Sequence, residues 1–589
     1  MKGKSHYKLP LVVILFSVIV AVVVLVIPTE NVQDTELAEE KRTLSDELHY
    51  AYSKDGNLYG VNSTENLVQR FSDTVYGGVV SHHLLANIDI AKFFYEFSDQ
   101  EVDRVIIIGP NHFYPTTFPA LSTTYDYETP FGEVRLDNEF IEGLVSDKLI
   151  QIDENTVDTE HAISSLVPYV AHYLPDAELV PIILTRNAPD SLLEGLADYL
   201  KKNNTENTIV VASVDFSHHL YSNASMLHDL RSVAAIKSFD IESLSELEID
   251  SPQSISVLLQ YLEAIGAKDV SLWQQNAASI FDEYDIDDVT SYVFAHARKG
   301  GIDEVPGASM LFFGDTMLGR DVERMIDGKV DLFSGIRGPE GNFLKGYDAI
   351  MVNLEGAIAS DECGVTDDEL LIQPDNLELL TQENISHVGV KNNHFQKCDE
   401  ETSLSIVKKT SLKPLGDISV IQGTGHDIAV VSVYAAPVPS DTSIIVDSVR
   451  GFADIYENLV INVHWGVEYS TESTKAQTDL AHAFIDAGAD IIIGHHPHVV
   501  QDVEKYKDGL IVYSLGNFIS DQKGELTKSG LAAGVFFGEN EKKLFLFPFE
   551  QINGVPTHLT QEDTGIVCGD IVKTGYPDAI HNCLIEVTE

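Results

Sequence analysis

Histidine and carboxylate residues recur where short apolar runs of the chain end. In the N-terminal half, three such runs lead into Ser81-His82-His83, Asn111-His112 and Asp215-Phe216-Ser217-His218-His219. Imidazole and carboxylate groups can bind divalent metals and transfer protons. Because the carboxyl ends of parallel strands meet at one edge of an open α/β sheet, these residues are predicted to converge on one site.

The C-terminal half repeats this pattern more densely. Apolar runs there lead into Gly314-Asp315, Asn353-Leu354-Glu355, Asn392-Asn393-His394, His464-Trp465-Gly466, Gly494-His495-His496-Pro497-His498 and Ser514-Leu515-Gly516-Asn517-Phe518. One Gly-Asp pair carries little information, but this ordered series is hard to obtain by chance. It predicts a second site built from strand ends.

The elements that would position these residues are predicted to be βα units. Short apolar runs alternate with amphipathic stretches such as 191–202 and 478–487, which indicates the α/β class with largely parallel sheets. A chain of 589 residues exceeds one ordinary core, and the Gly- and Pro-containing break at 299–307 separates two domains. No short-period repeat is present, which argues against a solenoid or a propeller.

The N-terminus predicts a membrane anchor. Residues 9–27 carry no charge, and a helix of them at about 1.5 Å per residue nearly spans a ~30 Å hydrocarbon core. Lysines precede this stretch and acidic residues follow it, which places the N-terminus in the cytoplasm and the domains outside the cell membrane. The alternative is a cleaved signal peptide, but no Ala-x-Ala site follows. We expect a cytoplasmic tip and anchor at 1–28 and an acidic stalk at 29–74.

Charge and cysteine content limit the partners. The chain has 92 Asp and Glu against 38 Lys and Arg, a formal charge of −54, so nucleic acid would be repelled. The acidic surface is interpreted as a solvated surface, with a cation-rich ligand as the alternative. The cysteines are Cys363, Cys398, Cys568 and Cys583, which allow two disulfides whose pairing stays open.

Residues 75–299 resemble the Memo family, found in prokaryotes as AmmeMemoRadiSam system protein B. The resemblance rests on the three histidine segments, on 125–130, on Glu160-His161-Ala162 and on 288–292. It implies a fold similar to class III extradiol dioxygenases. It also implies a pocket lined by His82, His112, Asp215 and His218. Asp250 stands where many members have a cysteine, and two histidines with a carboxylate suit iron or another divalent metal. The reaction is left open, since a fold does not specify it.

Residues 308–540 resemble the CapA (poly-gamma-glutamate synthesis) family, similar in fold to the calcineurin-like metallophosphoesterase sandwich, with 541–589 as a C-terminal extension. The resemblance implies a metal shell of Asp315, Glu355, Asn393, His464, His496 and His498. These ligands suit Mn, Fe or Zn, and two such ions ~3.5–4 Å apart can activate a water molecule. His394, beside the shell, would protonate a leaving group.

Some positions depart from the metallophosphoesterase pattern or are interpreted as structural. Met317 replaces a usual His and Glu355 a usual Asp, so one metal site is expected to be weaker. Lys397 stands where CapA relatives have an Asp, with Asp399 displaced by two residues. His482 is interpreted as a helix-surface residue, and Trp465 and Phe518 as packing residues.

Two functions follow from these motifs. The first is a metal-dependent hydrolase or transferase that acts on a capsule or cell-envelope polymer or a phosphoester, with an accessory Memo-like domain. The alternative is a non-catalytic envelope assembly or ligand-binding factor, which Met317 and Asp399 favour. The acidic surface opposes long-range attraction to polyglutamate unless bound metal or counterions intervene.

Overall fold

The N-terminal region is organised around one mixed sheet of eight strands. The computed structural model describes residues 48–588 except 64–69, 114, 277–286, 303–306, 339–340, 361–362, 364–369, 425 and 573–582. The sheet order is β10 (Asp269–Asn276), β11 (Ser291–Arg298), β2 (Val75–Val80), β9 (Thr208–Ser213), β3 (Arg104–Pro110), β8 (Glu178–Leu184), β4 (Ala120–Ser122) and β7 (Gln151–Ile152). The four central strands, β2, β9, β3 and β8, are parallel, as the apolar runs predicted.

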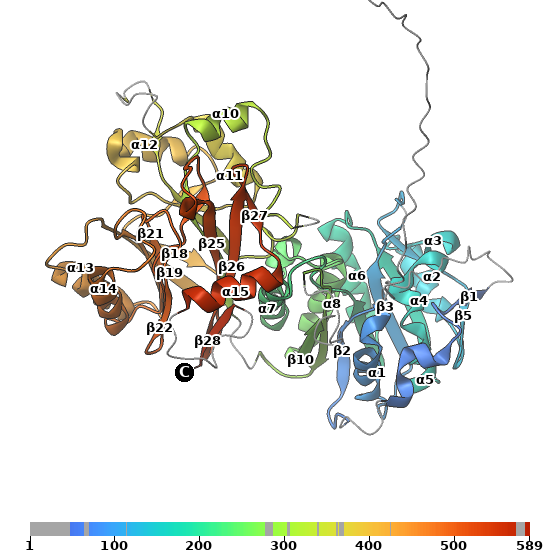
Figure 1. Cartoon of the computed structure of the whole chain (residues 1–589). Coiled ribbons are helices and arrows are strands. Elements are labelled where there is room, and N and C mark those ends of the chain that lie inside the picture. Colours follow the sequence, from blue (N-terminus) through green and yellow to red (C-terminus); the bar gives the residue numbers. More distant parts are fainter. Residues whose placement is uncertain are drawn as a thin grey trace, which may run out of the picture. The chain divides into compact units, whose positions relative to one another are not determined.

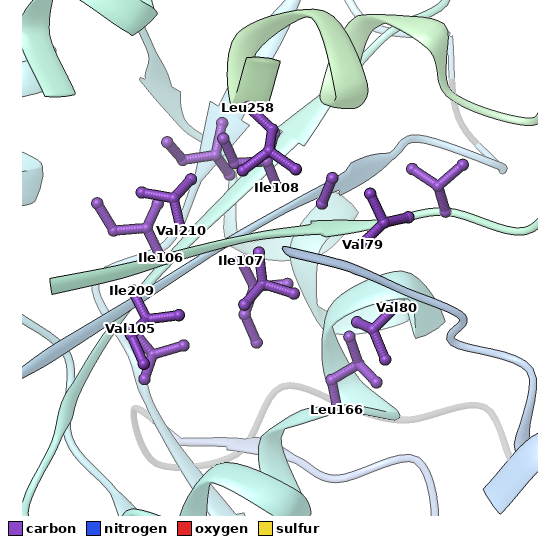
Figure 2. Close-up of a cluster of buried hydrophobic side chains, with 14 of the residues drawn as sticks. Val79, Val80, Val105, Ile106, Ile107, Ile108, Leu166, Ile209, Val210 and Leu258 are labelled. Carbon is purple, nitrogen blue, oxygen red and sulfur yellow. The ribbon is translucent and has the colours of Figure 1, made fainter. Parts of the chain in front are cut away.

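Helices cover both faces of these strands. They are α1 (Asn87–Tyr95), α2 (Asn138–Ser146), α3 (Glu154–Thr159), α4 (His161–Ser164), α5 (Val167–Tyr173), α6 (Asp190–Asn203), α7 (Ser222–Ser238) and α8 (Pro252–Ile265). Figure 2 shows Leu258 of α8 on one side of the strands and Leu166, between α4 and α5, on the other. Because both faces are covered, the central strands are apolar without alternation, as at 105–108.

The fold begins before the predicted domain start. β1 (Leu48–Tyr50) pairs in parallel with β5 (Asp126–Thr129), which also pairs with β6 (Gly132–Val134). Tyr59 and Val61 are buried in the core of the N-terminal region. Part of the segment predicted as a stalk, from Leu48 onward, is therefore folded.

Two sheets pack face to face in the C-terminal region. One has the order β17 (Lys413–Pro414), β16 (His387–Gly389), β13 (Ala349–Leu354), β12 (Ala308–Thr316), β25 (Ser529–Phe537), β26 (Glu541–Ile552) and β27 (Val555–His558). β24 (Asn517–Ile519) pairs with β12, and β28 (Leu584–Thr588) pairs with β26. The other has the order β18 (Ile418–Gln422), β19 (Asp427–Ala435), β20 (Asn458–Trp465), β21 (Ile491–His495), β23 (Gly509–Val512) and β22 (Val503–Tyr506). Phe312 and Met351 of the first sheet share a buried cluster with Val460 and Ile493 of the second.

Helices and disulfides complete this region. The helices are α10 (Asp321–Asp327), α11 (Glu378–Gln382), α12 (Glu400–Val407), α13 (Ser443–Ala453), α14 (Lys475–Asp486) and α15 (Gln561–Ile571), several of which are labelled in Figure 1. A short pair, β14 (Ala357–Ile358) and β15 (Leu371–Ile372), lies apart from the main sheets. The disulfides are Cys363–Cys398 and Cys568–Cys583, a pairing that the sequence had left open. β26 and β28 lie within 541–589, so much of that segment belongs to the sheet.

Helix α7 belongs to the N-terminal region by sequence but contributes to a core of the C-terminal region. Leu220, just before it, and Leu227 within it are buried in the same cluster as Leu311 of β12. Arg231 of α7 also forms a buried ion pair with Asp348, at 2.9 Å. Residues of both regions therefore share one core, and experiments are best made on the full chain.

The mixed α/β class is confirmed, and the predicted localisation is corrected. Among the described residues, no helix is long and apolar enough to cross a membrane. The longest, α7, has 17 residues and carries the charged Asp229, Arg231 and Lys237, so at ~1.5 Å per residue it is too short and too polar. The predicted anchor at 9–27 lies outside the described residues. The assignment of this chain as a single-pass membrane protein with extracytoplasmic domains is therefore not supported.

Candidate metal centres

The N-terminal centre forms where three adjacent parallel strands end. His82 follows β2, Asp215 follows β9 and His112 follows β3, and β9 lies between the other two. Asp250, just before α8, accepts a hydrogen bond from the backbone N–H of Asp215 at 3.1 Å. The sheet order thus brings together residues that are more than 130 positions apart in the chain.

Distances in this centre fit a shared cation. His82 Nε2 lies 3.5 Å from Asp215 Oδ2 and 3.5 Å from Asp250 Oδ2. His112 Nε2 lies 3.7 Å from the same Asp250 oxygen. Two sets of three ligand atoms lie within 4.8 Å of one another: His82 with His112 and His161, and His82 with Asp215 and Asp250.

His161 is the member of this centre that the site prediction omitted. Its ring stacks on that of His112, with centroids 4.4 Å apart, and lies 5.0 Å from that of His82. Glu160 binds His112 through both the ring Nδ1 and the backbone N–H, each at 2.8 Å. His161 starts the short helix α4 and does not follow a strand, so the strand-end pattern does not include it.

The two carboxylates have opposite pKa shifts. Burial and then the negative charge of Asp215 raise the pKa of Asp250, although a hydrogen bond to His112 opposes the rise. Burial also disfavours the charged form of Asp215, but the charges of His82 and His83 outweigh it and lower its pKa to about 2. One of two close buried carboxylates thus tends to keep a proton, and a metal ion can take the place of that proton.

His218, the remaining predicted residue, lies at the margin. Its backbone N–H donates to Glu248 Oε2 at 3.0 Å, and its Nδ1 lies 4.0 Å from Glu248 Oε1. It belongs to neither set of ligand atoms. The structure therefore brings together four of the five predicted residues and places His218 beside them.

The C-terminal centre lies at the ends of β12, β13, β20, β21 and β24. The register aligns Asp315 of β12 with Asn353 of β13 and with Asn517 of β24. On the other sheet it aligns His464 with His495. The facing sheets thus bring both sets of residues to one edge of the sandwich.

Short contacts connect the predicted ligands in two groups. His498 Nδ1 lies 3.0 Å from Asp315 Oδ2 and 3.8 Å from Glu355 Oε2. The backbone N–H of His496 donates to Asp315 Oδ2 at 3.3 Å. His464 Nε2 contacts Asn393 Oδ1 at 2.8 Å. Ligand atoms of Glu355, His496 and His498 lie within 4.8 Å of one another.

Several polar atoms here are buried and have no hydrogen-bond partner within the part of the chain that the structure describes. Both carboxylate oxygens of the fully buried Glu355 are in this state, as are Nδ1 of His394, His495 and His496. Burial and then the charge of Asp315 raise the pKa of Glu355 well above its usual value. An unpaired buried carboxylate is costly, and a coordinated cation would satisfy it. Glu355 is thus the best-fitting ligand of the centre.

Asparagines that the site prediction did not select orient the ligands. Asn353 Nδ2 donates to Asp315 Oδ1 at 2.7 Å, and Asn517 Oδ1 lies 3.2 Å from His498 Nδ1. Asn392 accepts the backbone N–H groups of His394 and Phe395 and so shapes the loop that carries Asn393. These asparagines lie inside the sequence motifs, but residue type alone does not distinguish an asparagine that orients a ligand from one that is a ligand.

Backbone geometry around the centre is tight. A Cβ at Gly314 would lie 2.0 Å from the carbonyl oxygen of Gly516, which accepts the N–H of Asp315 at 2.9 Å. His496 and His498 have φ of 98° and 60°, a region that non-glycine residues occupy at a cost. Such strain is common at functional sites, where the surrounding structure imposes it.

His394 contacts the acidic side of the centre. Its Nε2 lies 3.6 Å from Glu355 Oε1. Burial and then the charge of Lys397 lower the pKa of His394 to about 4. The imidazole is thus neutral near pH 7 in this state and would accept a proton before donating one.

The residues interpreted as structural are placed accordingly. Trp465 is fully buried, with Nε1 donating to Tyr513 O at 2.9 Å, and Phe518 stacks on Phe313 with centroids 4.1 Å apart. His482 of α14 stacks on Tyr506, away from the centre. Met317 is buried, and its side chain provides only a sulfur atom.

Comparison with known proteins agrees with this organisation. Residues 61–295 match the family described as "Memo-like protein", and residues 429–522 match "Bacterial capsule synthesis protein PGA_cap". "Capsule biosynthesis protein CapA" of Bacillus anthracis is 42% identical over 115 residues, 19% of this chain and 27% of that protein. "PGA biosynthesis protein CapA" of Bacillus subtilis (strain 168) is 28% identical over 251 residues, 37% of this chain and 64% of that protein.

The N-terminal region has relatives of its own. A "MEMO1 family protein" of Saccharolobus islandicus is 29% identical over 179 residues, 29% of this chain and 60% of that protein. The chain thus spans less than two thirds of the length of each of these curated relatives. This chain combines a Memo-like region with a following region similar to CapA proteins, in the order that the motifs predicted.

Proposed function

We propose that the region 308–540 holds divalent cations and acts as a metal-dependent hydrolase or transferase in the metabolism of a capsule polymer or a related phosphoester. The observation that carries this proposal is Glu355, a fully buried carboxylate with no hydrogen-bond partner among the described residues. The similarity to proteins named for capsule and PGA biosynthesis supports the substrate class. The finer fold assignment, a calcineurin-like metallophosphoesterase sandwich, is part of the same proposal.

The ligands of this centre divide by their contacts. Asp315, Glu355 and His498 are mutually close and form the acidic side. Asn393 contacts His464, whose ring centroid lies 4.7 Å from that of His496. Mn, Fe or Zn bound there would act as a Lewis acid and lower the pKa of a coordinated water. His394 would transfer the proton of the reacting group, and Asn353 would fix the orientation of Asp315.

The Memo-like region is proposed as an accessory metal-binding domain with a fold similar to class III extradiol dioxygenases. Its ligands would be His82, His112, Asp215 and Asp250, supported by the short distances among them. His161 would be a fifth candidate. No reaction is assigned to this centre, since ligand chemistry alone does not define one.

Elemental analysis of the purified full chain tests the proposal directly. The wild type should contain divalent metal, and the double variant Asp315→Asn, His496→Ala should lose ~2 ions from the C-terminal centre. His482→Ala is the matched control, because it removes a histidine of the same region that lies away from the centre. Turnover of phosphoester and γ-glutamyl substrates should be lost in the double variant only.

Two outcomes would contradict parts of this proposal. Equal metal content in the wild type and the double variant would remove the C-terminal centre. A metal-loaded wild type that turns over none of these substrates, while a capsule polymer shifts its melting temperature, would favour the non-catalytic assembly factor.

A further inference from the structure

Arg320 has a strained backbone close to the C-terminal centre. It follows β12, the strand that carries Asp315, and lies at the N-terminus of α10 with φ 55° and ψ −123°. This conformation favours glycine, so the backbone of a non-glycine residue there is strained. The side chain makes no capping hydrogen bond to α10, although the backbone C=O of Arg320 accepts the N–H of Arg324 at 3.4 Å.

The guanidinium group is held in place but only partly used. Its Nη2 donates to Asp521 Oδ1 at 2.5 Å and lies 3.9 Å from the sulfur of Met317. Asp521 also accepts the backbone N–H of Asp321 at 3.4 Å, which fixes the carboxylate. Arg320 Nε is buried and has no hydrogen-bond partner among the described residues. Because the side chain as a whole is 33% exposed, the fixed guanidinium is accessible to an incoming oxyanion.

Arg320 is linked to two strands that carry residues of the centre. Met317 directly follows β12, the strand that carries Asp315, and its sulfur contacts the Arg320 side chain. Asp521, the partner of the guanidinium, lies two residues after β24, which begins at Asn517, and Asn517 contacts His498 at 3.2 Å. The guanidinium is thus held beside the strand ends that form the centre.

We propose that Arg320 is a specificity-determining residue that binds an oxyanion of the substrate, a phosphate or a carboxylate, beside the C-terminal metal centre. The inference rests on the proposed function of that centre and adds the chemical class of its ligand. The planar guanidinium fixes the orientation of this anion. The strained backbone at residue 320 is then the cost of aiming this group.

Calorimetric titration of Mn²⁺-loaded full chain with inorganic phosphate and with glutamate tests this inference. Arg320→Gln should weaken binding of the recognised anion roughly 10- to 100-fold, the range expected for a hydrogen bond to a charged group. Arg320→Lys should recover part of the loss, since it restores charge without the fork. Arg324→Gln is the matched control, because Arg324 lies one turn further on α10 with its side chain 77% exposed.

Arg320→Gly is a second variant that separates loss of anion binding from a folding defect. Glycine adopts this backbone conformation without strain, so the variant should fold and bind metal as the wild type does, yet lose the anion. Metal content, measured on every variant, separates the two proposals. Weaker binding of phosphate, of glutamate or of both by Arg320→Gln than by the wild type supports the inference. The anion whose binding is weakened identifies the oxyanion.

Two results would overturn the inference. One is equal anion affinity in Arg320→Gln and Arg324→Gln, and the other is a wild type that binds neither anion. If the wild type takes up no metal, the proposed function fails, and the same titrations on that protein still decide whether Arg320 binds an anion.

Discussion

The two candidate centres share one arrangement of ligands but differ in how many of their buried polar atoms form hydrogen bonds within the protein. In both, parallel strands end in histidines and carboxylates that meet at a sheet edge. In the N-terminal centre, Glu160 holds His112 and Ser213 contacts His82 at 3.1 Å, so both rings have partners. Among the described residues, one ligand oxygen of the N-terminal centre, Asp250 Oδ1, is buried without a hydrogen bond, whereas both carboxylate oxygens of Glu355 and Nδ1 of His496 are in this state in the C-terminal centre. The larger number of unpaired ligand atoms makes the C-terminal centre the stronger case for a cation.

A buried cluster elsewhere in the N-terminal region shows what a purely structural arrangement looks like. His49 of β1 is fully buried, with Nδ1 2.9 Å from Asp158 and Nε2 2.7 Å from Thr123 and 3.2 Å from Glu154. Each ring nitrogen thus has a protein partner. The contrast shows that clustered histidines alone do not indicate a metal centre.

The largest expected effect comes from metal removal. A chelator should destabilise the metal-loaded wild type by about 4 kcal/mol if free metal is ~1,000 times its Kd. In Glu355→Gln the chelator should lower the free energy of unfolding only by the contribution of metal in the N-terminal centre, because the neutral amide at position 355 needs no cation. Urea unfolding with and without chelator measures both, and a wild type insensitive to chelator would contradict the contrast between the centres.

Reduction of the disulfides should affect the C-terminal region alone. Cys363–Cys398 closes a separation of 35 residues and Cys568–Cys583 one of 15. The chain-entropy estimate for losing them is about 4 and about 3 kcal/mol. Cys398 lies four residues after His394, so Cys363→Ser with Cys398→Ser should speed hydrogen exchange in that loop. Exchange in the Memo-like region, which has no cysteine, provides the internal control.

Loss of the His49 cluster should lower stability without affecting either centre. His49→Gln should cost about 1–3 kcal/mol, because Asp158 is left buried with a weaker partner. His219→Gln is the control, since His219 makes a similar ion pair with Asp288 at an exposed position. Unfolding measured in urea reports the stability, and bound metal should be the same in both variants.

The pH dependence of this cluster has a defined sign. Burial lowers the pKa of His49, but Asp158 and Glu154 outweigh burial and raise the pKa above 6.5. The stability that protonated His49 contributes is therefore lost as pH rises through the raised value. Burial raises the pKa of Glu154, but hydrogen bonds from His49 and Thr123 outweigh burial and lower the pKa from 4.5 to about 2. The stability that the ionised Glu154 contributes is therefore lost as pH falls through that range. The stability difference between wild type and His49→Gln should therefore be largest between pH 4.5 and 6.5.

The smallest effect is expected at Asp250. Asp250→Asn removes one of the two close carboxylates and should weaken metal binding in the N-terminal centre at least ~10-fold. Asp288→Asn, at an exposed carboxylate, should leave the affinity unchanged. Competition with a metal indicator measures the affinity. If Asp250→Asn binds metal as the wild type does, Asp250 is not a ligand, and the two centres differ more than proposed.

The strand-end rule explains what the sequence could predict. His82, His112 and Asp215 follow adjacent parallel strands, so their convergence follows from sheet order alone. His161 begins a short helix, and its position depends on tertiary packing that no local pattern encodes. Arg320 is found only through its backbone conformation, which its residue type would not suggest.

Two strands lie outside the bounds that the motifs indicate, for a physical reason. β1 is three residues long and joins a sheet through partners 78 positions away, as in the pair Leu48 and Asp126. β26 and β28 pair across residues 541–588, beyond the last recognisable motif. Such strands gain stability from non-local pairing rather than from their own composition.

The contact between Gly314 and Gly516 sets how much the C-terminal centre can vary. The carbonyl that receives the amide of Asp315 occupies the space where any side chain at position 314 would begin. Even a methyl group would separate β12 from β24 and carry Asp315 away from Asn517, although no polar group would be altered. The clearance between two backbones, more than the choice of ligand, therefore limits which sequences can build this centre.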